Sequence, residues 1–394
     1  MTSDPRVVAR GLEASFRDRF GAGAPPRLFL APGRVNLMGA HLDHNGGPVV
    51  PMAIDRHTHF ALRPRADDRA RLASTREAGE VEVRLGELPE APEGAWWDYP
   101  LGVVRGLALA GAPLGGFDLL VGGDLPIGAG LSSSASITVG TAFALDRVFG
   151  LGRGLRAAID TALYAERDFV GVPCGIMDPF AVALSREDHL LWVDCKDESV
   201  AHLPLPADRF AIAVADSGLR RELARGAFKE RVDECREAFR LLAPHQPGAV
   251  CLRDVPRDVF EAHERELPPK IALRARHVVE EVQRTFEARK ALEAGDVAGF
   301  GRRITEAHES LARNFEVSVP ELDVLVEAAV STRGVLGSRL TGAGFGGCVV
   351  ILCERSATGA LTEAVERAFE RRFGRRPPLE LFGGDRGPRE FDTT

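Results

Sequence analysis

Apolar residues recur at helical spacing in several long stretches of the chain and follow shorter, strand-like patterns elsewhere. Helical spacing predicts helices over residues 3–20, 97–110, 155–170, 221–242, 272–294, 297–315, 320–332 and 357–373. Alternating or short continuous apolar runs predict strands over residues 27–31, 48–54, 57–62, 81–85, 117–121 and 210–215, and another that ends near residue 194. Because the two kinds of element alternate irregularly, the pattern predicts an α+β protein with mixed or antiparallel sheets.

The length and composition indicate a folded protein of two domains. A chain of 394 residues exceeds what one core usually organises, so we expect residues 1–205 and 206–394 to form separate domains. The formal charge is −7, and basic residues alternate with acidic ones, which argues against a nucleic-acid partner. We find neither a signal peptide nor a membrane span, and the six cysteines form no CxxC pair. These features favour a cytoplasmic protein, and they leave the oligomeric state open.

A glycine-rich segment at residues 124–136, DLPIGAGLSSSAS, leads into a predicted helix. Glycine lets the backbone approach a ligand closely, and free N–H groups at a helix N-terminus attract anions. This pattern predicts a phosphate-binding loop, although no GK[ST] follows as in a Walker A loop; the plainer alternative is a glycine turn with a serine N-cap. The residues we expect to contact phosphate are Gly128, Gly130, Ser132, Ser133 and Ser134. A second cluster at residues 341–347, which includes Gly344, is weak evidence alone and gains weight as a partner of the first.

Polar side chains concentrate in residues 31–47, APGRVNLMGAHLDHNGG, which we interpret as a loop that binds hydroxyl groups. The alternatives are a solvated turn, or a metal site for which Asp43 and His44 lack a convincing third ligand. His57 and His59 share one face of a predicted strand and are most simply structural. The polar residues of the loop are Arg34, Asn36, His41, Asp43, His44 and Asn45.

A further carboxylate, Asp178, lies in the apolar turn GVPCGIMDPF, twelve positions after Glu166. A carboxylate among apolar residues must be paired or functional, because an isolated buried charge is costly. The alternative is a helix N-cap that precedes Pro179.

Together these segments resemble the GHMP small-molecule kinases, and within them the galactokinase family, over nearly the whole chain. GRVNLMGAHLDHNGG is similar to that family's sugar-binding motif, and DLPIGAGLSSSAS to its phosphate loop. GVPCGIMDPF resembles its catalytic segment, RLTGAGFGGC its third motif, and HESLARNFEVSVPELDVLV the helix and turn before that motif. The resemblance implies an N-terminal mixed α/β domain, a C-terminal ferredoxin-like domain and an active site in the cleft between them.

The resemblance also implies an ATP- and Mg²⁺-dependent kinase that phosphorylates the anomeric C1 hydroxyl of a hexose. By position in the motifs, Asp178 would be the base and Arg34 the cation beside it, and whether Asp178 takes the proton or only orients the hydroxyl stays open. Ser134 and Glu166 would hold Mg²⁺. The other glycines and serines named above would contact ATP, while the residues near the sugar would be Ala40, His41, Asp43, Gly175 and Phe228.

Two departures from the family pattern bear on the sugar. The family usually has Glu where this chain has Ala40, near C6 of the sugar, and Tyr where it has Phe228. A site without that carboxylate would accept a substrate carboxylate at C6, because facing anions repel strongly in a poorly solvated pocket. The stretch DSGLRRELARGAFKERVDEC also resembles galacturonokinases, and Arg220, Arg221 or Lys229 would supply the counter-charge. As the sugar substrate we therefore expect D-galacturonate first, D-galactose second and L-arabinose third. The alternative from another functional class is a protein that senses sugar and ATP without catalysis.

Overall fold

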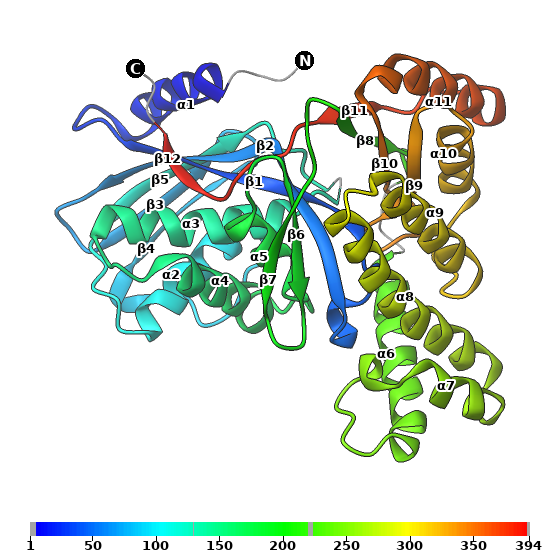
Figure 1. Ribbon diagram of the computed structural model, residues 1–394. Coiled ribbons are helices and arrows are strands. Elements are labelled where there is room, and N and C mark those ends of the chain that lie inside the picture. Colours follow the sequence, from blue (N-terminus) through cyan, green and yellow to red (C-terminus); the bar gives the residue numbers. More distant parts are fainter. Residues whose placement is uncertain (1–4, 129, 220–223, 392–394) are drawn as a thin grey trace. The chain divides into compact units, whose positions relative to one another are not determined.

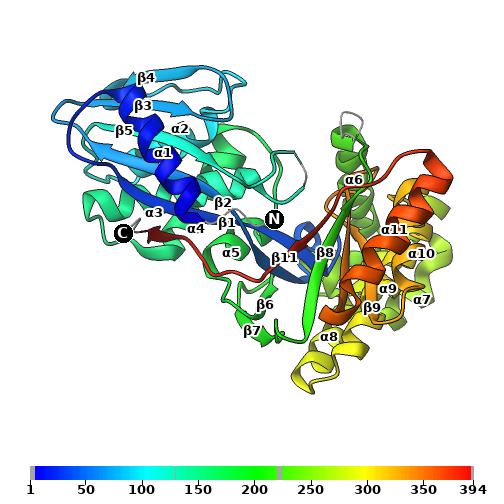
Figure 2. The ribbon, with the colours of Figure 1, turned by 90° about the horizontal axis from the view of Figure 1, so that it is seen from above.

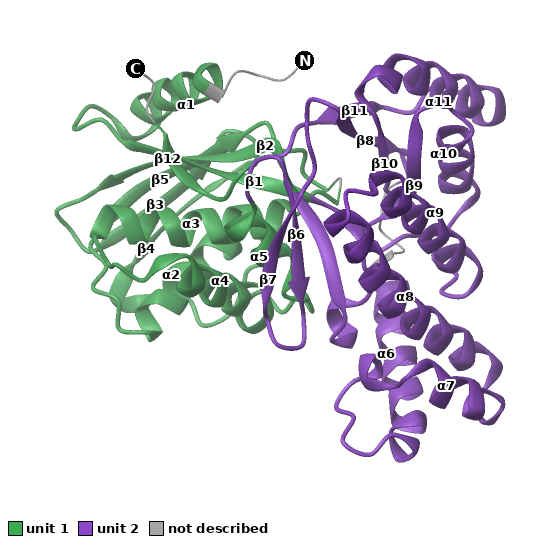
Figure 3. Cartoon of the chain, in the orientation of Figure 1, with its two compact units in different colours: residues 1–34, 53–185, 385–394 green, residues 35–52, 186–384 purple. Residues whose placement is uncertain are grey.

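The computed structural model describes residues 5–128, 130–219 and 224–391, which form two compact units (Figure 3). Unit 1 comprises residues 1–34, 53–185 and 385–394, and unit 2 comprises residues 35–52 and 186–384. The chain therefore passes between the units after Arg34, Met52, Ser185 and Gly384. The predicted boundary between residues 205 and 206 falls inside unit 2, and it stays a prediction about how the chain divides into domains.

Unit 1 is built on a mixed sheet with the strand order β12-β1-β2-β5-β3-β4 (Figure 1). β3 and β5 are parallel, whereas β1–β12, β2–β5 and β3–β4 are antiparallel pairs, so the expected mixed sheet is confirmed. The two runs predicted over 48–54 and 57–62 form one long strand. The strands are β1 (Arg27–Met38), β2 (Pro48–Pro64), β3 (Arg69–Ser74), β4 (Glu80–Arg84), β5 (Phe117–Gly123) and β12 (Arg389–Phe391).

Helices cover both faces of this sheet (Figure 1). On one face, Leu12 and Phe16 of α1 pack in a cluster with Ala61 of β2. The neighbouring side chain, Phe60, points to the opposite face, where its ring packs so closely against Gly140 of α3 that a Cβ there would lie 2.3 Å away. The helices of unit 1 are α1 (Pro5–Phe20), α2 (Asp98–Leu109), α3 (Ser133–Phe149), α4 (Gly154–Tyr164) and α5 (Met177–Leu184).

Unit 2 contains an antiparallel sheet with the order β11-β8-β10-β9 and a hairpin, β6–β7, that pairs with the first residues of β2 (Figure 2). The strands are β6 (His189–Asp194), β7 (Val200–Pro204), β8 (Phe210–Asp216), β9 (Val335–Thr341), β10 (Cys348–Glu354) and β11 (Leu379–Phe382). The helices are α6 (Ala224–Leu242), α7 (Arg257–His263), α8 (Pro269–Glu293), α9 (Val297–Arg313), α10 (Pro320–Val330) and α11 (Thr358–Phe373).

Three details differ from the sequence analysis. Arg34 and Asn36 lie on β1 rather than in a loop, because the strand continues through Pro32 and Gly33 to Met38. The sequence did not predict the strands β3, β7, β11 and β12 or the short helices α5 and α7, and the segment around Asp178, expected to be an apolar turn, begins α5. Residues 221–223 of the predicted helix 221–242 lie outside the described residues. None of the described helices is long and apolar enough to cross a membrane.

Candidate active site

A bidentate ion pair joins Arg34 of β1 to Asp178 in the first turn of α5, inside unit 1. Arg34 Nε lies 2.7 Å from Asp178 Oδ1, and Nη2 lies 2.7 Å from Oδ2. The third guanidinium nitrogen, Nη1, donates to the carbonyl oxygen of Gly130 at 2.7 Å. The planar fork of Arg34 thus fixes Asp178 and the phosphate loop at once. This pairing explains how a carboxylate is tolerated in an apolar turn.

The phosphate loop adds a second contact to the same carboxylate. Ser132 donates a short hydrogen bond from Oγ to Asp178 Oδ2, so Asp178 accepts from Arg34 twice and from Ser132 once. Ser132 has φ 59° and directly precedes α3, while Gly128 and Gly130 have φ 76° and 77°. Three left-handed residues so close together fit a loop that folds tightly before a helix N-terminus. We predicted Ser132 as a phosphate contact and did not foresee its contact with Asp178.

Glu166, a predicted Mg²⁺ ligand, is buried in a π-helical turn, Ala165–Phe169, that continues α4. Burial, and then the negative charge of Asp178, raise the pKa of Glu166 to about 7, although hydrogen bonds from Ser134 and Thr138 act in the opposite direction. Thr138 Oγ1 lies 3.2 Å from Glu166 Oε1. A carboxylate flanked by hydroxyl oxygens is the kind of donor set that Mg²⁺ accepts. The structure therefore brings Ser134 and Glu166 together, as that role requires.

In unit 2, the predicted sugar segment is a turn over residues 39–47 whose backbone is held from α8. Glu281 Oε1 accepts hydrogen bonds from the N–H groups of Gly39 at 3.2 Å and Ala40 at 3.1 Å. His277 Nε2 lies 3.2 Å from the carbonyl oxygen of Ala40. Glu281 is fully buried and paired with Arg284, and neither Glu281 nor His277 was predicted from the sequence. A carboxylate is thus present beside residue 40 even though Ala40 itself has none.

The side chains of this turn retain unused hydrogen-bonding capacity. His41 is buried with φ 57°, and its Nε2 has no partner within the described part of the chain; the same holds for His44 Nε2 and Asn36 Oδ1. Burial, and then the nearby imidazoles, lower the pKa of His41 well below its usual value, so the ring is neutral. Buried polar atoms are normally paired, so these atoms are suited to a polyhydroxylated ligand.

Asp43 and His44 form a pair, with His44 Nδ1 3.2 Å from Asp43 Oδ1. Burial disfavours both charges, but the pairing with His44 outweighs it for Asp43 and lowers that pKa, while Asp43 and then the Cys235 thiol raise the pKa of His44 to about 9. The ring of Phe228 lies 5.7 Å from those of His41 and His44, measured between centroids. A flat apolar surface next to hydrogen-bonding groups suits a sugar ring.

The remaining predicted residues fall in two places. Gly175 lies in unit 1, three positions before Asp178. Gly344 lies in unit 2 with φ 84°, and a Cβ there would sit 2.4 Å from the carbonyl oxygen of Val317. Close packing against Val317 therefore already requires a glycine at position 344, whether or not ATP contacts it.

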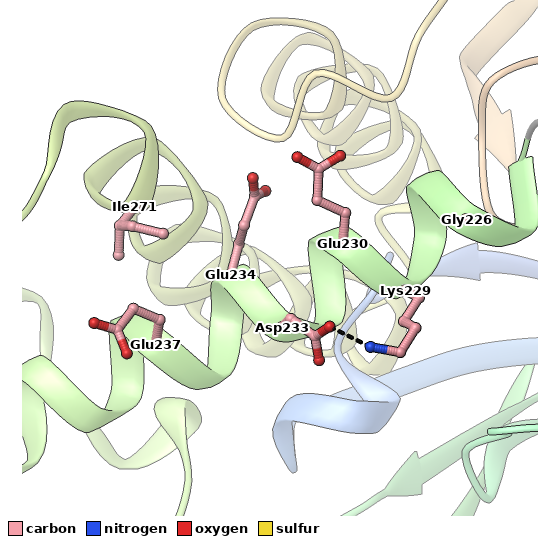
Figure 4. Close-up of a pocket in the computed structure, with 7 residues that line it drawn as sticks. All are labelled: Gly226, Lys229, Glu230, Asp233, Glu234, Glu237 and Ile271. Atoms are coloured by element: carbon pink, nitrogen blue, oxygen red, sulfur yellow. Dashed lines mark hydrogen bonds and ion pairs between the residues drawn. The ribbon is translucent and has the colours of Figure 1, made fainter.

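The proposed counter-charges for a sugar carboxylate are not supported. Lys229 is exposed and pairs with Asp233 at 2.6 Å. It lines a groove of about 490 Å³ on α6 whose other charged members are all acidic (Figure 4). Arg220 and Arg221 lie outside the described residues. Apart from Lys229, the groove contains none of the residues predicted for the site; it is lined by Gly226, Lys229, Glu230, Asp233, Glu234, Glu237 and Ile271.

Comparison with known proteins identifies the family. Residues 14–64 match the galactokinase galactose-binding signature, residues 98–186 the N-terminal domain of GHMP kinases and residues 288–371 their C-terminal domain. A galactokinase from Roseiflexus is 44% identical over 367 residues, which cover 92% of each chain. The chain belongs to the galactokinase family. Human galactokinase is 41% identical and matches 90% of each chain.

Solved structures agree with this assignment. A Lactococcus lactis galactokinase, crystallised with galactose, superposes with a TM-score of 0.93 at 32% identity, covering 98% of this chain and all of that one. A mevalonate kinase from Methanococcus jannaschii, at 19% identity and a TM-score of 0.67, shares the fold. The expected two-domain GHMP kinase fold is confirmed, and the protein is an ATP-dependent sugar kinase of this family.

The preference for galacturonate is not supported. The Roseiflexus and human relatives carry the galactokinase name, which backs the second choice, galactose, better than the first. The structure also weakens the premise, because Glu281 places a carboxylate against the backbone of Ala40. The charge around residue 40 is therefore set by its neighbours as well as by its own side chain.

Proposed function

We propose that this protein transfers the γ-phosphoryl group of ATP to the C1 hydroxyl of D-galactose with Mg²⁺ as cofactor. The observation that carries the reaction is the Asp178 carboxylate, held by the fork of Arg34 and by Ser132. The galactose-binding signature over residues 14–64 supports the sugar. A sugar kinase needs a phosphoryl-transfer set and a sugar-binding set, and we assign the first to residues of unit 1 and the second mainly to the turn in unit 2.

In the proposed reaction, the C1 oxygen bonds to the γ-phosphorus while the bond from phosphorus to the β–γ bridging oxygen breaks, and ADP leaves. A carboxylate offers about four lone-pair positions, and the three donors on Asp178 leave about one for a substrate hydroxyl. We therefore assign Asp178 first to orienting the C1 hydroxyl and then to accepting its proton late in the transfer. Arg34 keeps Asp178 in place, and its positive charge offsets charge that develops on the transferring group.

Ser134 and Glu166 would hold Mg²⁺, since their oxygens lie together and a buried carboxylate benefits from a cation. When bound, Mg²⁺ neutralises the phosphate oxygens and fixes their geometry. The N–H groups of Gly128, Gly130, Ser132 and Ser133 would contact the phosphates. In unit 2, His41, His44 and Asn36 would form hydrogen bonds to sugar hydroxyls through the atoms that lack protein partners.

The test is a substrate panel with purified protein, ATP and Mg²⁺, following ADP release with D-galactose, D-galacturonate and L-arabinose. We expect kcat/KM for galactose to exceed that for galacturonate by at least about tenfold, because a pocket that hydrogen-bonds a neutral hydroxyl leaves polar groups unpaired or repelled with the wrong substituent. Higher turnover of galacturonate would overturn the choice of sugar. ADP release at background level with all three sugars would instead support a sensor without catalysis.

Ala40→Glu probes the C6 end of the sugar. If residue 40 faces C6, this variant raises the ratio of galactose to L-arabinose turnover, because arabinose has no C6 group to contact. An unchanged ratio would show that residue 40 lies away from C6. The exposed Ala110→Glu controls for the added negative charge, and circular dichroism checks that the variant at the buried Ala40 is folded.

A further inference from the structure

Three side chains of unit 1 that the proposed reaction does not use form a compact cluster: His57 and His59 on β2, and Asp124 directly after β5. One possible ligand atom from each residue lies within 4.8 Å of those of the other two. The strand geometry explains this meeting. Residues two apart on a strand share a face, which brings the two rings to 5.8 Å between centroids.

Strand pairing places the carboxylate beside these rings. His59 of β2 lies opposite Gly122 of β5 in the antiparallel register, so the chain reaches Asp124 beside His57. The N–H of His57 donates to Asp124 Oδ1 at 2.8 Å, and the N–H of Asp124 donates to the carbonyl oxygen of His57 at 3.1 Å. Backbone pairing therefore positions the cluster, which does not depend on long flexible side chains.

His59 carries the observation that a structural role does not explain. His59 is only 2% exposed, and its Nε2 has no hydrogen-bond partner among the described residues. A buried polar nitrogen without a partner costs free energy. A neutral imidazole nitrogen is a preferred ligand of Zn²⁺.

A second carboxylate orients the other ring. Asp385 is hydrogen-bonded to His57 Nε2, and it also accepts from Arg389 Nη2 at 3.0 Å. When Nε2 of a neutral imidazole donates its proton to a carboxylate, Nδ1 carries the lone pair. Metal-binding histidines commonly have such an outer carboxylate, which fixes the ring and strengthens it as a ligand. Arg389 is the cation that opposes metal binding, and its charge is balanced by Asp385.

We propose that His57, His59 and Asp124 bind one Zn²⁺ ion. Two nitrogens and one carboxylate oxygen make three protein ligands, and Asp124 is only half-buried, which leaves access for a water molecule at the fourth position. Imidazole ligands do not suit Mg²⁺, so this site is distinct from Ser134 and Glu166. Because Asp124 opens the phosphate loop, the ion would tie that loop to β2.

The experiment measures metal binding directly, without sugar or nucleotide, so its result does not depend on the kinase activity. Tag-free protein is stripped of metal and titrated with Zn²⁺ and with Co²⁺ by equilibrium dialysis and visible absorption. We expect one tight equivalent, with the d–d bands of tetrahedral Co²⁺ and no thiolate-to-metal band, because no ligand is a cysteine. Excess Mg²⁺ should not displace it.

Two variants remove ligands, and one removes the outer partner. His59→Gln should lose the equivalent, and Asp124→Asn should lose or greatly weaken it while its amide oxygen still accepts from the His57 N–H. Asp385→Asn should weaken affinity by about 10- to 100-fold. Far-ultraviolet circular dichroism checks that each variant is folded. If His59→Gln does not fold, Asp124→Asn still tests the proposal.

The matched control is His263→Gln in unit 2. His245, His263 and Glu266 also lie within 4.8 Å of one another, but there His263 Nδ1 is paired with Glu266 at 2.9 Å. This control should keep the tight equivalent. The proposal is overturned if the wild type binds no tight equivalent, if His59→Gln and Asp124→Asn both bind like the wild type, if His263→Gln abolishes binding, or if a thiolate band appears.

Discussion

The phosphoryl-transfer residues of unit 1 and the sugar turn of unit 2 differ in how far the protein satisfies its own polar groups. Asp178 already accepts from Arg34 and Ser132, and Arg34 also reaches Gly130. In the sugar turn, His41 Nε2 and His44 Nε2 have no partner in the described part of the protein, and the same is true of Asn36 Oδ1 on the adjoining strand β1. Transition-state charge is best met by groups fixed beforehand, whereas a ligand must find free donors and acceptors. The residues that would carry out phosphoryl transfer therefore already have hydrogen-bond partners within the protein, whereas the polar atoms near the sugar turn do not.

Asp178→Asn should have the largest effect, because it removes the anion on which the transfer set is built. We expect kcat to fall by about 10²- to 10⁴-fold, as for loss of a general base, while ATP binding is retained. Steady-state kinetics and calorimetric titration with ATP measure the two quantities. Near-normal turnover would remove Asp178 from the reaction.

Arg34→Lys should lower kcat by about 10- to 100-fold, because lysine keeps the charge but cannot make the fork to Asp178 and reach Gly130 as well. Arg27→Lys is the matched control on the same strand. Arg27 makes a similar fork to Glu390, at 2.7 and 2.8 Å, on the surface. If both variants were equally active, the fork of Arg34 would not be needed for transfer.

His41→Phe tests the free capacity of the sugar turn. The phenyl ring keeps the packing against Phe228 and Phe315, whose centroids lie 5.7 and 4.6 Å from that of His41, but it has no nitrogen. Losing one hydrogen bond of about 1 kcal/mol should raise the KM for galactose by roughly fivefold. The KM for ATP is the internal control. A rise in both constants would point to a general disturbance of the fold.

The Asp43–His44 pair should affect stability, with the smallest effect on turnover. The pKa of His44 is raised to about 9 in the folded protein, so the folded state holds its proton more tightly than the unfolded state does. The contribution of this proton to the free energy of unfolding is fully present below pH 6.5 and is lost as the pH rises through about 9. Urea unfolding of wild type and His44→Gln should therefore show free energies that converge between these pH values. Curves that stay parallel would contradict the pairing.

Much of the fold followed from the sequence because long amphipathic segments carry a strong periodic signal. The arginine-rich strand β3 and the short helix α7 were missed, since neither gives a long apolar pattern. The continuation of β1 to Met38 was hidden by Pro32 and Gly33, which normally interrupt strands.

The site could be predicted only where its residues lie within one motif. Arg34 and Asp178 were paired through the family resemblance, and the structure supplies the fork. Glu281 and His277 were missed because they contact the sugar turn from more than 230 positions away. Their only signal in the sequence was that a carboxylate and an imidazole fall on the buried face of a predicted helix, where such groups need partners. The sequence does not say which partner they have.

The last strand of the chain has a consequence for synthesis of the protein on the ribosome. β12 pairs with β1 through Leu28 and Phe391, and Arg27 pairs with Glu390. Residues 363 positions apart thus complete one edge of the unit 1 sheet. At translation rates of about 5–20 residues per second, β1 waits on the order of 20 to 70 s for this partner. During that interval the nascent chain exposes a strand edge that is open to wrong pairing, so we expect this stage to be the one that benefits most from chaperones.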